Sequence, residues 1–178
     1  MDSLIDGVDQ RTNLAGNNRL ELLLFRLGGN QLYGINVFKV REAIPCPSLT
    51  KIPGGHAFSR GVASIRGQTV NIVDLSQSIG RPAVSDPNNN FVILTEYNRS
   101  VQGFLVSAVD RIINISWSDV LPPPAASGSD NYMTAITRVD DQLVQIIDVE
   151  QVLAEVMGSN TAVSSDIAEQ ASEQNSEQ

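Results

Sequence analysis

The chain of 178 residues has very little cysteine and histidine and no long apolar run, the features that build cross-linked, metal-bound or membrane-spanning proteins. Its single cysteine, Cys46, excludes an internal disulfide and agrees with a reducing compartment. With one histidine, His56, it lacks the ligands for a structural zinc site. No stretch approaches the roughly 20 apolar residues of a membrane span, and the first residues lack the features of a secretion signal. We therefore expect a cytoplasmic protein without metal or cofactor, whose contact with membranes is at most indirect.

Positive charge is also scarce, with 12 basic against 20 acidic residues and a net charge of −8. The basic residues are scattered instead of clustered, which argues against nucleic acid or an anionic membrane surface as a partner. Hydrophobic residues make up 42% of the chain, which is enough for a buried core in one or two small domains. Other proteins are therefore the expected partners.

Both ends of the chain are polar. Residues 1–18 predict a loose or briefly helical N-terminal arm. The segment beyond Gly158 is rich in Ser, Gln, Glu and Ala, with four acidic residues and no basic or aromatic residue, so it cannot bury enough surface to offset its own ordering. We expect a folded domain over 19–157, followed by a disordered acidic tail or linker over 158–178.

Between these ends, short apolar segments separated by turn signals predict a mainly β chain. Gly28, Gly29 and Asn30 form a turn signal between strand candidates at 20–27 and 31–37. Residues 37–44 predict a short helical turn that the following prolines stop. The other strand candidates are 61–66, 68–74, 90–97, 101–107, 111–117, 132–139 and 142–148.

The last predicted element is a helix over 149–157, because Val149, Val152, Leu153 and Val156 recur at helical spacing. Asp148 precedes this helix, and Asp74 ends a strand before a short helix in the same way. A carboxylate pair suggests acid–base chemistry. The shared position predicts instead that each aspartate is an N-cap acceptor.

An internal repeat predicts the architecture. With a shift of 69 positions, Gly34–Val37 aligns with Gly103–Val106 and Val40 aligns with Val109. With a shift of 74, Gln68–Leu75 aligns with Gln142–Val149, so the second half needs only a longer loop. Two similar halves made mostly of short strands imply two small β-barrels.

Arg66 stands at the tip of an otherwise apolar hairpin, which favours contact with another molecule. Arginine is common at interface anchors, because its planar fork makes several hydrogen bonds while its stem packs on apolar surface. The alternative is an ion pair with a nearby carboxylate that orders the hairpin. The corresponding turn in the second half, Asp140-Asp141, has no arginine, and this favours the partner role.

Cys46 and His56 lie ten residues apart in a proline-rich loop, so a nucleophilic pair has to be considered. This gives an alternative function, a small-ligand-binding or hydrolytic β-barrel domain with its site in the loop from Cys46 to His56. An exposed loop histidine is the simpler interpretation. Gly54-Gly55 lacks the following Gly-Lys-Ser or Gly-Lys-Thr of a phosphate-binding loop and predicts a plain loop.

Several segments in order resemble the CheW-like coupling domain of bacterial chemotaxis. They are Leu22–Arg26, Gln31–Val37 with Val40–Glu42, Gly61 and Val62 with Ile65–Gly67, Ile72–Leu75, Gly103–Val106 with Val109 and Asp110, and Leu143–Leu153. Within that family, Leu20–Leu27 and Tyr33–Glu42 are most similar to the coupling portion of CheV, which carries a phosphorylatable receiver domain after this one. A receiver needs a lysine near its end, and the only lysines here are Lys39 and Lys51, so we expect the receiver to be absent from this chain.

The resemblance implies two intertwined five-stranded barrels and coupling without chemistry. It also implies a cytoplasmic location at receptor arrays on the inner membrane face. The implied partners are the cytoplasmic tip of methyl-accepting chemoreceptors and the histidine kinase CheA. Carried over by position, the partner contacts fall at Val40, Glu42, Gly61, Arg66 and Phe91. A further hypothesis is that the chain is the targeting half of a receiver-containing protein.

Overall fold

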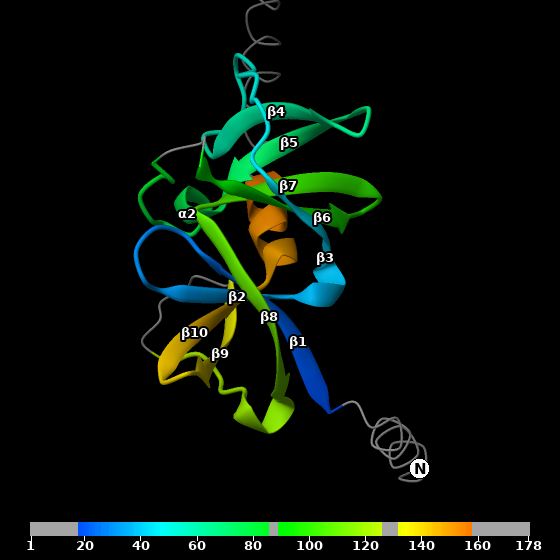
Figure 1. The fold of residues 1–178 in the computed structure, drawn as a ribbon. Coiled ribbons are helices and arrows are strands. Elements are labelled where there is room, and N and C mark those ends of the chain that lie inside the picture. The colour runs from blue at the N-terminus through cyan, green and yellow to red at the C-terminus, as the bar shows by residue number, and fades with distance from the viewer. Residues whose placement is uncertain (1–17, 86–88, 126–131, 158–178) are drawn as a thin grey trace, which may run out of the picture.

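Two five-stranded sheets make up the computed structural model, which describes residues 18–85, 89–125 and 132–157 (Figure 1). The predicted mainly β class with short helices and a C-terminal helix is confirmed. The predicted arm, apart from Asn18, and the predicted disordered tail over 158–178 lie outside the described residues. Within those residues, no helix has the length and apolar character needed to cross a bilayer.

The first sheet has the strand order β8-β1-β2-β10-β9, and the second has the order β3-β6-β7-β5-β4. The strands of the first sheet are β8 (Ala108–Ser116), β1 (Arg19–Arg26), β2 (Leu32–Asn36), β10 (Gln142–Ile147) and β9 (Met133–Val139). Those of the second are β3 (Val40–Pro45), β6 (Phe91–Tyr97), β7 (Ser100–Val106), β5 (Gln68–Asp74) and β4 (Ser59–Ile65). The helical elements are η1 (Val37–Lys39), α2 (Leu75–Ser78), η3 (Trp117–Asp119) and residues 149–157.

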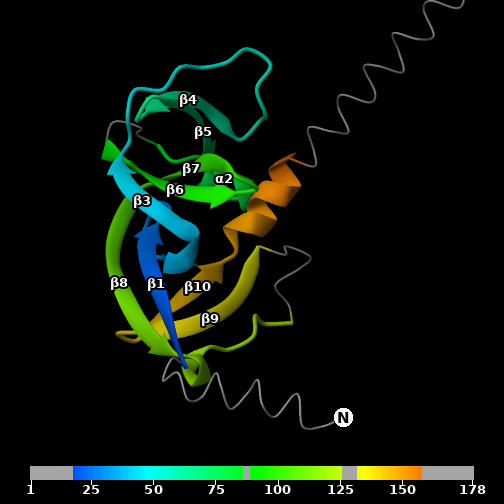
Figure 2. The same cartoon turned by 90° about the vertical axis from the view of Figure 1, so that its right-hand side faces the viewer.

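The internal repeat is confirmed by the strand order. Replacing each strand of one sheet by the strand whose number differs from it by five gives the other sheet, including the single parallel pair in each, β5 with β7 and β10 with β2. Each sheet combines two strands from one half of the chain with three from the other. The two subdomains are therefore intertwined, and Figure 2 shows them stacked with the helix of residues 149–157 between them at one side.

The predicted helical turn over 37–44 is wrong for most of its length. Only Val37–Lys39 is helical, as a 3-10 turn whose cap is the Asn36 side chain, which accepts a hydrogen bond from the Phe38 N–H at 3.0 Å. The next residues form β3, which alternates between half-buried and exposed positions and pairs with β6. Partial burial with period two favours a strand over a helix. The internal repeat already indicated a strand here, because Val40 aligns with Val109, which lies in the strand β8.

Both sheets curl toward closure, which supports the predicted barrel shape. In the second sheet, Thr50 follows the edge strand β3 and forms a two-bond bridge with Val62 on the opposite edge strand β4. In the first sheet, Leu121 follows β8 and bridges Ile136 on β9 in the same way. These bridges satisfy part of the backbone at the edges, which otherwise is available to pair with another chain.

Apolar side chains form three cores. One fills the inside of the first sheet around Leu22, Leu24 and Val144, and another fills the inside of the second around Val70, Ile72 and Leu105. The third lies between the sheets and contains Phe25, Tyr33, Ile35, Phe104, Val106, Val149, Val152, Leu153 and Val156. Full burial of a large apolar side chain contributes about 1.5–3 kcal/mol. The predicted helix over 149–157 is thus confirmed, and its four regularly spaced apolar residues form the face that packs between the sheets.

The two aspartates are N-caps, as the sequence predicts. The Asp74 carboxylate accepts a hydrogen bond from the Gln77 N–H at 3.1 Å, and the Asp148 carboxylate accepts one from the Glu150 N–H at 2.9 Å. Asp74 is fully buried and also accepts from the Val84 N–H at 3.1 Å. These contacts account for both carboxylates without acid–base chemistry.

Gly61 has a structural reason to be glycine. Its φ of +126° lies in a region that other residues rarely adopt, and a Cβ at this position would lie 2.5 Å from the Thr50 carbonyl oxygen. The contact adjoins the bridge that closes the second sheet. The absence of a side chain at Gly61 therefore lets the loop approach β4.

We expect Gly61→Ala to lower the free energy of unfolding by about 2 kcal/mol or more, because it combines backbone strain with a clash against backbone atoms. Gly80→Ala is the matched control, since Gly80 also has a positive φ of +76° but has nothing within 4 Å of the position that a Cβ would occupy. Urea unfolding followed by circular dichroism measures both. Equal losses of stability in the two variants would contradict the role given to the contact with Thr50.

Candidate partner-binding surface

Arg66 forms an ion pair with Glu42 across the curled second sheet. Arg66 and Gly67 make the two-residue turn between β4 and β5, with φ values of 51° and 77° that are typical of a type I′ hairpin. The Arg66 Nη2 atom lies 2.6 Å from Glu42 Oε1 on β3. The predicted alternative, an ion pair that orders the hairpin, is therefore what the structure contains. The Arg66 side chain is still 76% exposed.

The second half has the same ion pair with its charges exchanged. Asp140 and Asp141 form the turn between β9 and β10, with φ values of 47° and 62°. Arg111 Nη2 on β8 lies 2.5 Å from Asp140 Oδ2. Asp140 aligns with Arg66 at the shift of 74, and Arg111 aligns with Glu42 at the shift of 69. The inference from the missing arginine is therefore wrong, because the arginine of this half stands on the strand instead of the turn.

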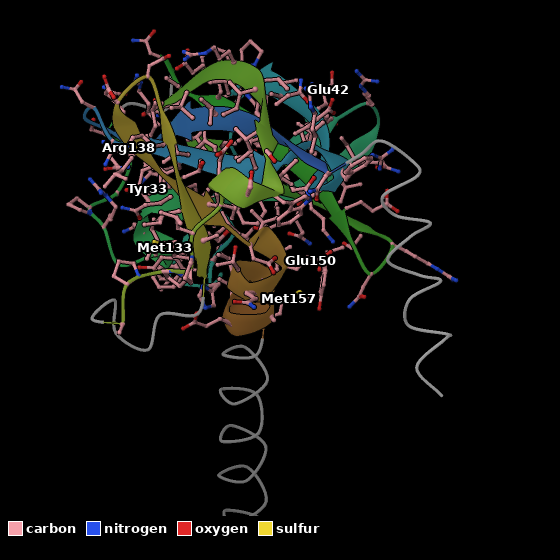
Figure 3. All side chains as sticks on the ribbon, turned by 90° about the horizontal axis from the view of Figure 1, so that it is seen from below. Tyr33, Glu42, Met133, Arg138, Glu150 and Met157 are labelled. Atoms are coloured by element: carbon pink, nitrogen blue, oxygen red, sulfur yellow. The ribbon has the colours of Figure 1, made fainter. Side chains whose placement is uncertain are left out.

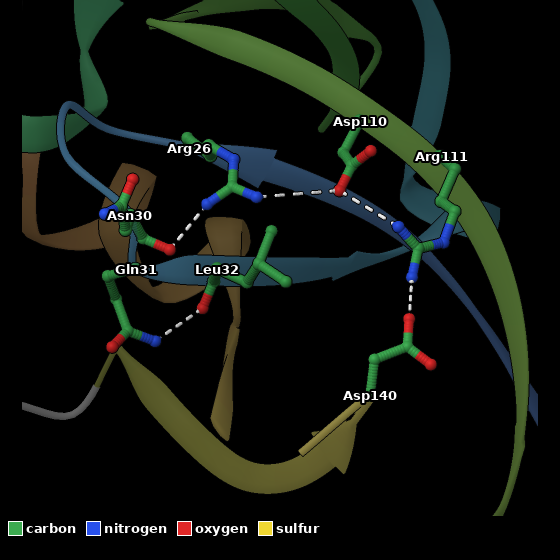
Figure 4. Close-up of polar contacts among 7 residues, drawn as sticks. All are labelled: Arg26, Asn30, Gln31, Leu32, Asp110, Arg111 and Asp140. Atoms are coloured by element: carbon green, nitrogen blue, oxygen red, sulfur yellow. Dashed lines mark hydrogen bonds and ion pairs between the residues drawn. The ribbon is translucent and has the colours of Figure 1, made fainter. Parts of the chain in front are cut away.

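The two pairs differ in their surroundings. Figure 4 shows Arg111 also facing Asp110, at 3.3 Å, while Asp110 lies 3.9 Å from Arg26. Arg26 in turn donates to the Asn30 carbonyl oxygen. The charges around Arg111 thus satisfy one another in a network that includes Arg26 on β1. Within the described residues Arg66 makes no ion pair or hydrogen bond other than that with Glu42, so most of its donors face solvent.

The other residues predicted to bind partners do not all lie near the ion pair of Glu42 and Arg66. Val40 lies two residues before Glu42 and is half-buried against the core between the sheets. Phe91 is also half-buried against that core, and it pairs with Pro45 at the far end of the β3–β6 ladder. Gly61 lies within β4, away from the Arg66 turn. The structure therefore brings together Glu42 and Arg66. A register shift in the β3–β6 ladder separates Glu42 from Val40, which packs on the core between the sheets, and Gly61 and Phe91 lie elsewhere.

Sequence reasoning missed one exposed apolar side chain in the segment that leads into β3. Phe38 in η1 is 87% exposed, two residues before Val40. Its neighbour Lys39 does not contribute to the charge around Glu42, because its Nζ atom pairs with Glu150 on the C-terminal helix. Figure 3 shows Glu42 well away from that helix. We refer to Phe38, Val40, Glu42 and Arg66 as the β3 surface.

Cys46 and His56 are not arranged as a nucleophile and its base. The Cys46 side chain packs against the core inside the second sheet, and its Sγ atom donates to the Pro47 carbonyl oxygen at 3.4 Å. Burial raises the pKa of the Cys46 thiol, while the charge of Arg60 acts in the opposite direction. The His56 Nδ1 atom accepts from the Phe58 N–H at 3.2 Å. In the part of the chain that the structure describes, no cluster of three or more potential metal ligands occurs.

Comparison with known proteins decides the family. The family model for the CheW-like domain matches residues 21–157, which include both sheets except the first two residues of β1. The chain belongs to the CheW-like domain family. The alternative of a ligand-binding or hydrolytic barrel finds no support in this comparison.

The relatives of this CheW-like domain are chemotaxis proteins. Chemotaxis protein CheV3 of Helicobacter pylori is 39% identical over 148 residues, which cover 76% of this chain and 48% of CheV3. Chemotaxis protein CheW of Klebsiella aerogenes is 29% identical over 136 residues, or 75% of this chain and 81% of the relative. The chain spans about half the length of the CheV relatives it matches.

A solved structure confirms the fold of the CheW-like domain. The crystal structure of the scaffolding protein TtCheW from Thermoanaerobacter tengcongensis matches with a TM-score of 0.66 and 28% identity. The match covers 73% of this chain and 84% of TtCheW. The CheW-like resemblance inferred from sequence motifs and the two-sheet architecture are therefore both confirmed.

The two ion pairs of the repeat have opposite polarity, which suggests that the charges of Glu42 and Arg66 can be exchanged. Reversing either charge, Glu42→Arg or Arg66→Glu, places like charges together and should lower the free energy of unfolding by about 0.5–1 kcal/mol. The double variant restores the attraction with the polarity of Arg111 and Asp140, so its stability should return close to that of the parent domain. Urea unfolding at low and high salt measures this coupling. Additive losses in the double variant would show that the two side chains do not interact.

Proposed function

We propose that this CheW-like domain is a non-enzymatic adaptor in chemotaxis, which joins the cytoplasmic tip of transmembrane chemoreceptors to the histidine kinase CheA. It acts at receptor arrays on the inner face of the membrane and transmits receptor state by contact. Membership in the CheW-like family supports this, as do relatives that are named chemotaxis proteins. The similar fold of TtCheW, a scaffolding protein, agrees with a role without chemistry.

The observation that carries the proposal is the exposed guanidinium of the β3 surface. Arg66 is fixed at the tip of a hairpin by Glu42, yet most of its donors remain available, because 76% of its side chain is open to solvent. A preordered arginine costs less conformational entropy on binding than a mobile one. Phe38, which is 87% exposed in the turn before β3, and the half-buried Val40 supply apolar surface of the kind that protein interfaces combine with such anchors.

Gly61 and Phe91 take a supporting part in this proposal. Gly61 allows the loop to approach β4, and Phe91 packs between β6 and the core, so both fix the backbone that carries the β3 surface. Changes at either position act on partner binding through the fold. This separates them from Arg66, whose side chain is exposed.

The similarity to CheV proteins extends the proposal. In a longer protein of that kind, a domain such as this one supplies the attachment to receptors and CheA. The C-terminal helix packs its apolar face between the sheets and so links the domain core to whatever follows it in the sequence.

Co-sedimentation with receptor-bearing membranes and CheA tests the proposal. Arg66→Ala should weaken binding about tenfold, which corresponds to roughly 1.4 kcal/mol, while leaving the fold intact. The double variant Glu42→Arg with Arg66→Glu gives the sharper comparison, because it keeps the internal ion pair and removes the positive charge from the hairpin tip. We expect it to fold normally and to bind as weakly as Arg66→Ala.

Binding restored to the parent level by the double variant would mean that Arg66 acts only inside the domain. Failure of the unaltered chain to bind either partner would contradict the adaptor function as a whole. Arg138→Ala on β9 in the first sheet serves as the control for loss of an exposed arginine.

A further inference from the structure

The described residues form an open hollow of about 720 Å³ between the loop that follows β3 and the start of β4. Its lining includes Lys51, His56 and Arg60 and contains no aspartate or glutamate. This composition is unusual in a chain with 20 acidic and 12 basic residues. Its volume lies within the range of about 300–1,000 Å³ that is typical of small-molecule sites.

The charge of Lys51 is not neutralised within the part of the chain that the structure describes. Lys51 forms no ion pair there, whereas Lys39, the other lysine, is paired with Glu150. Loop lysines are often merely solvated. Lys51, however, lines a concave surface that also includes His56 and Arg60, together with apolar side chains such as Leu49 and Ile52.

Arg60 is held in place beside the hollow. Its Nη1 atom lies 3.7 Å from the buried Asp74 carboxylate, and its Nη2 atom donates to the Val84 carbonyl oxygen at 3.3 Å. The Arg60 side chain is 28% exposed to solvent. A guanidinium anchored on one side presents its remaining donors at low entropic cost.

His56 offers a third donor. Its Nδ1 atom accepts the Phe58 N–H, so the proton of the neutral ring resides on Nε2. Backbone hydrogen bonds fix the surrounding loop, from the Ser59 N–H to the His56 carbonyl at 2.9 Å and from the Gly55 N–H to the Ile52 carbonyl at 3.2 Å. The bridge between Thr50 and Val62 ties the same loop to β4. The hollow is therefore built in advance of any ligand.

We propose that this hollow binds a small molecule through an oxyanion, a phosphate or a carboxylate, held by Lys51, His56 and Arg60. The donors are side chains, so the site does not need the glycine-rich loop and helix of a nucleotide-binding motif, which the sequence lacks. Cys46 is not part of the lining, and no reaction is implied. The proposal stands independently of the adaptor function, because it concerns binding by the isolated chain.

Isothermal titration calorimetry tests the site, with inorganic phosphate and citrate as separate probes at constant ionic strength near 0.15 M. We expect the chain to bind at least one of them, and Lys51→Gln to raise the Kd at least tenfold. Lys39→Gln is the matched control, because it removes the same charge far from the lining residues, and it should leave the Kd unchanged. His56→Gln should also weaken binding, which separates the site from a general effect of charge.

Binding of phosphate alone assigns the site to phosphorylated ligands, and binding of citrate alone assigns it to carboxylates. Absence of binding by both probes would overturn the proposal. An equal effect of Lys39→Gln and Lys51→Gln would also overturn it, because the interaction would then be nonspecific. Circular dichroism of each variant establishes that the comparison is made between folded proteins.

Discussion

Neither sheet of this domain can form from one half of the chain. β1 and β2 come from the first half, yet their neighbours β8 and β10 come from the second, and the same exchange builds the other sheet. The core between the sheets depends on this arrangement, because Phe25 and Tyr33 face Phe104 and Val106 only when both sheets are complete. Folding of the two subdomains is therefore expected to be a single cooperative event, in which non-local contacts form together.

This constraint also determines where the edges of the sheets lie. β3 and β4 are the outer strands of one sheet, β8 and β9 are those of the other, and each pair is drawn together by a backbone bridge and an ion pair. The ion pairs have opposite polarity, Glu42 with Arg66 and Arg111 with Asp140. The repeat thus preserves the closing interaction but gives the two equivalent corners different charge patterns.

The sequence predicted those features that depend on local pattern. The strand predicted over 20–27 corresponds to β1, and the two caps Asp74 and Asp148 follow from their positions before helices. The mistaken helix over 40–44 has a local cause, because the cap at Asn36 starts a helical turn and partial burial in β3 only becomes visible once β6 is beside it.

The candidate site was less predictable for a different reason. Arg66 was selected from its place at a hairpin tip, and Val40 and Glu42 through a family resemblance. The pairing of Glu42 with Arg66 depends on a sheet order in which β3 and β4 are not neighbours. The exposure of Phe38 depends on a single 3-10 turn, which is too short to produce a periodic pattern of apolar residues in the sequence. Hydrophobic alternation reports which residues are buried, and it contains no information on which edges of a curled sheet approach each other.

Amide hydrogen exchange of the chain, alone and bound to receptor membranes with CheA, tests most directly whether partners bind at the β3 surface. We expect added protection on binding in residues 37–45 and in the hairpin around Arg66, with smaller changes at the equivalent residues 106–114 and 139–142. Protection confined to those second-half residues, or no change in 37–45, would contradict the claim that the β3 surface is where partners bind.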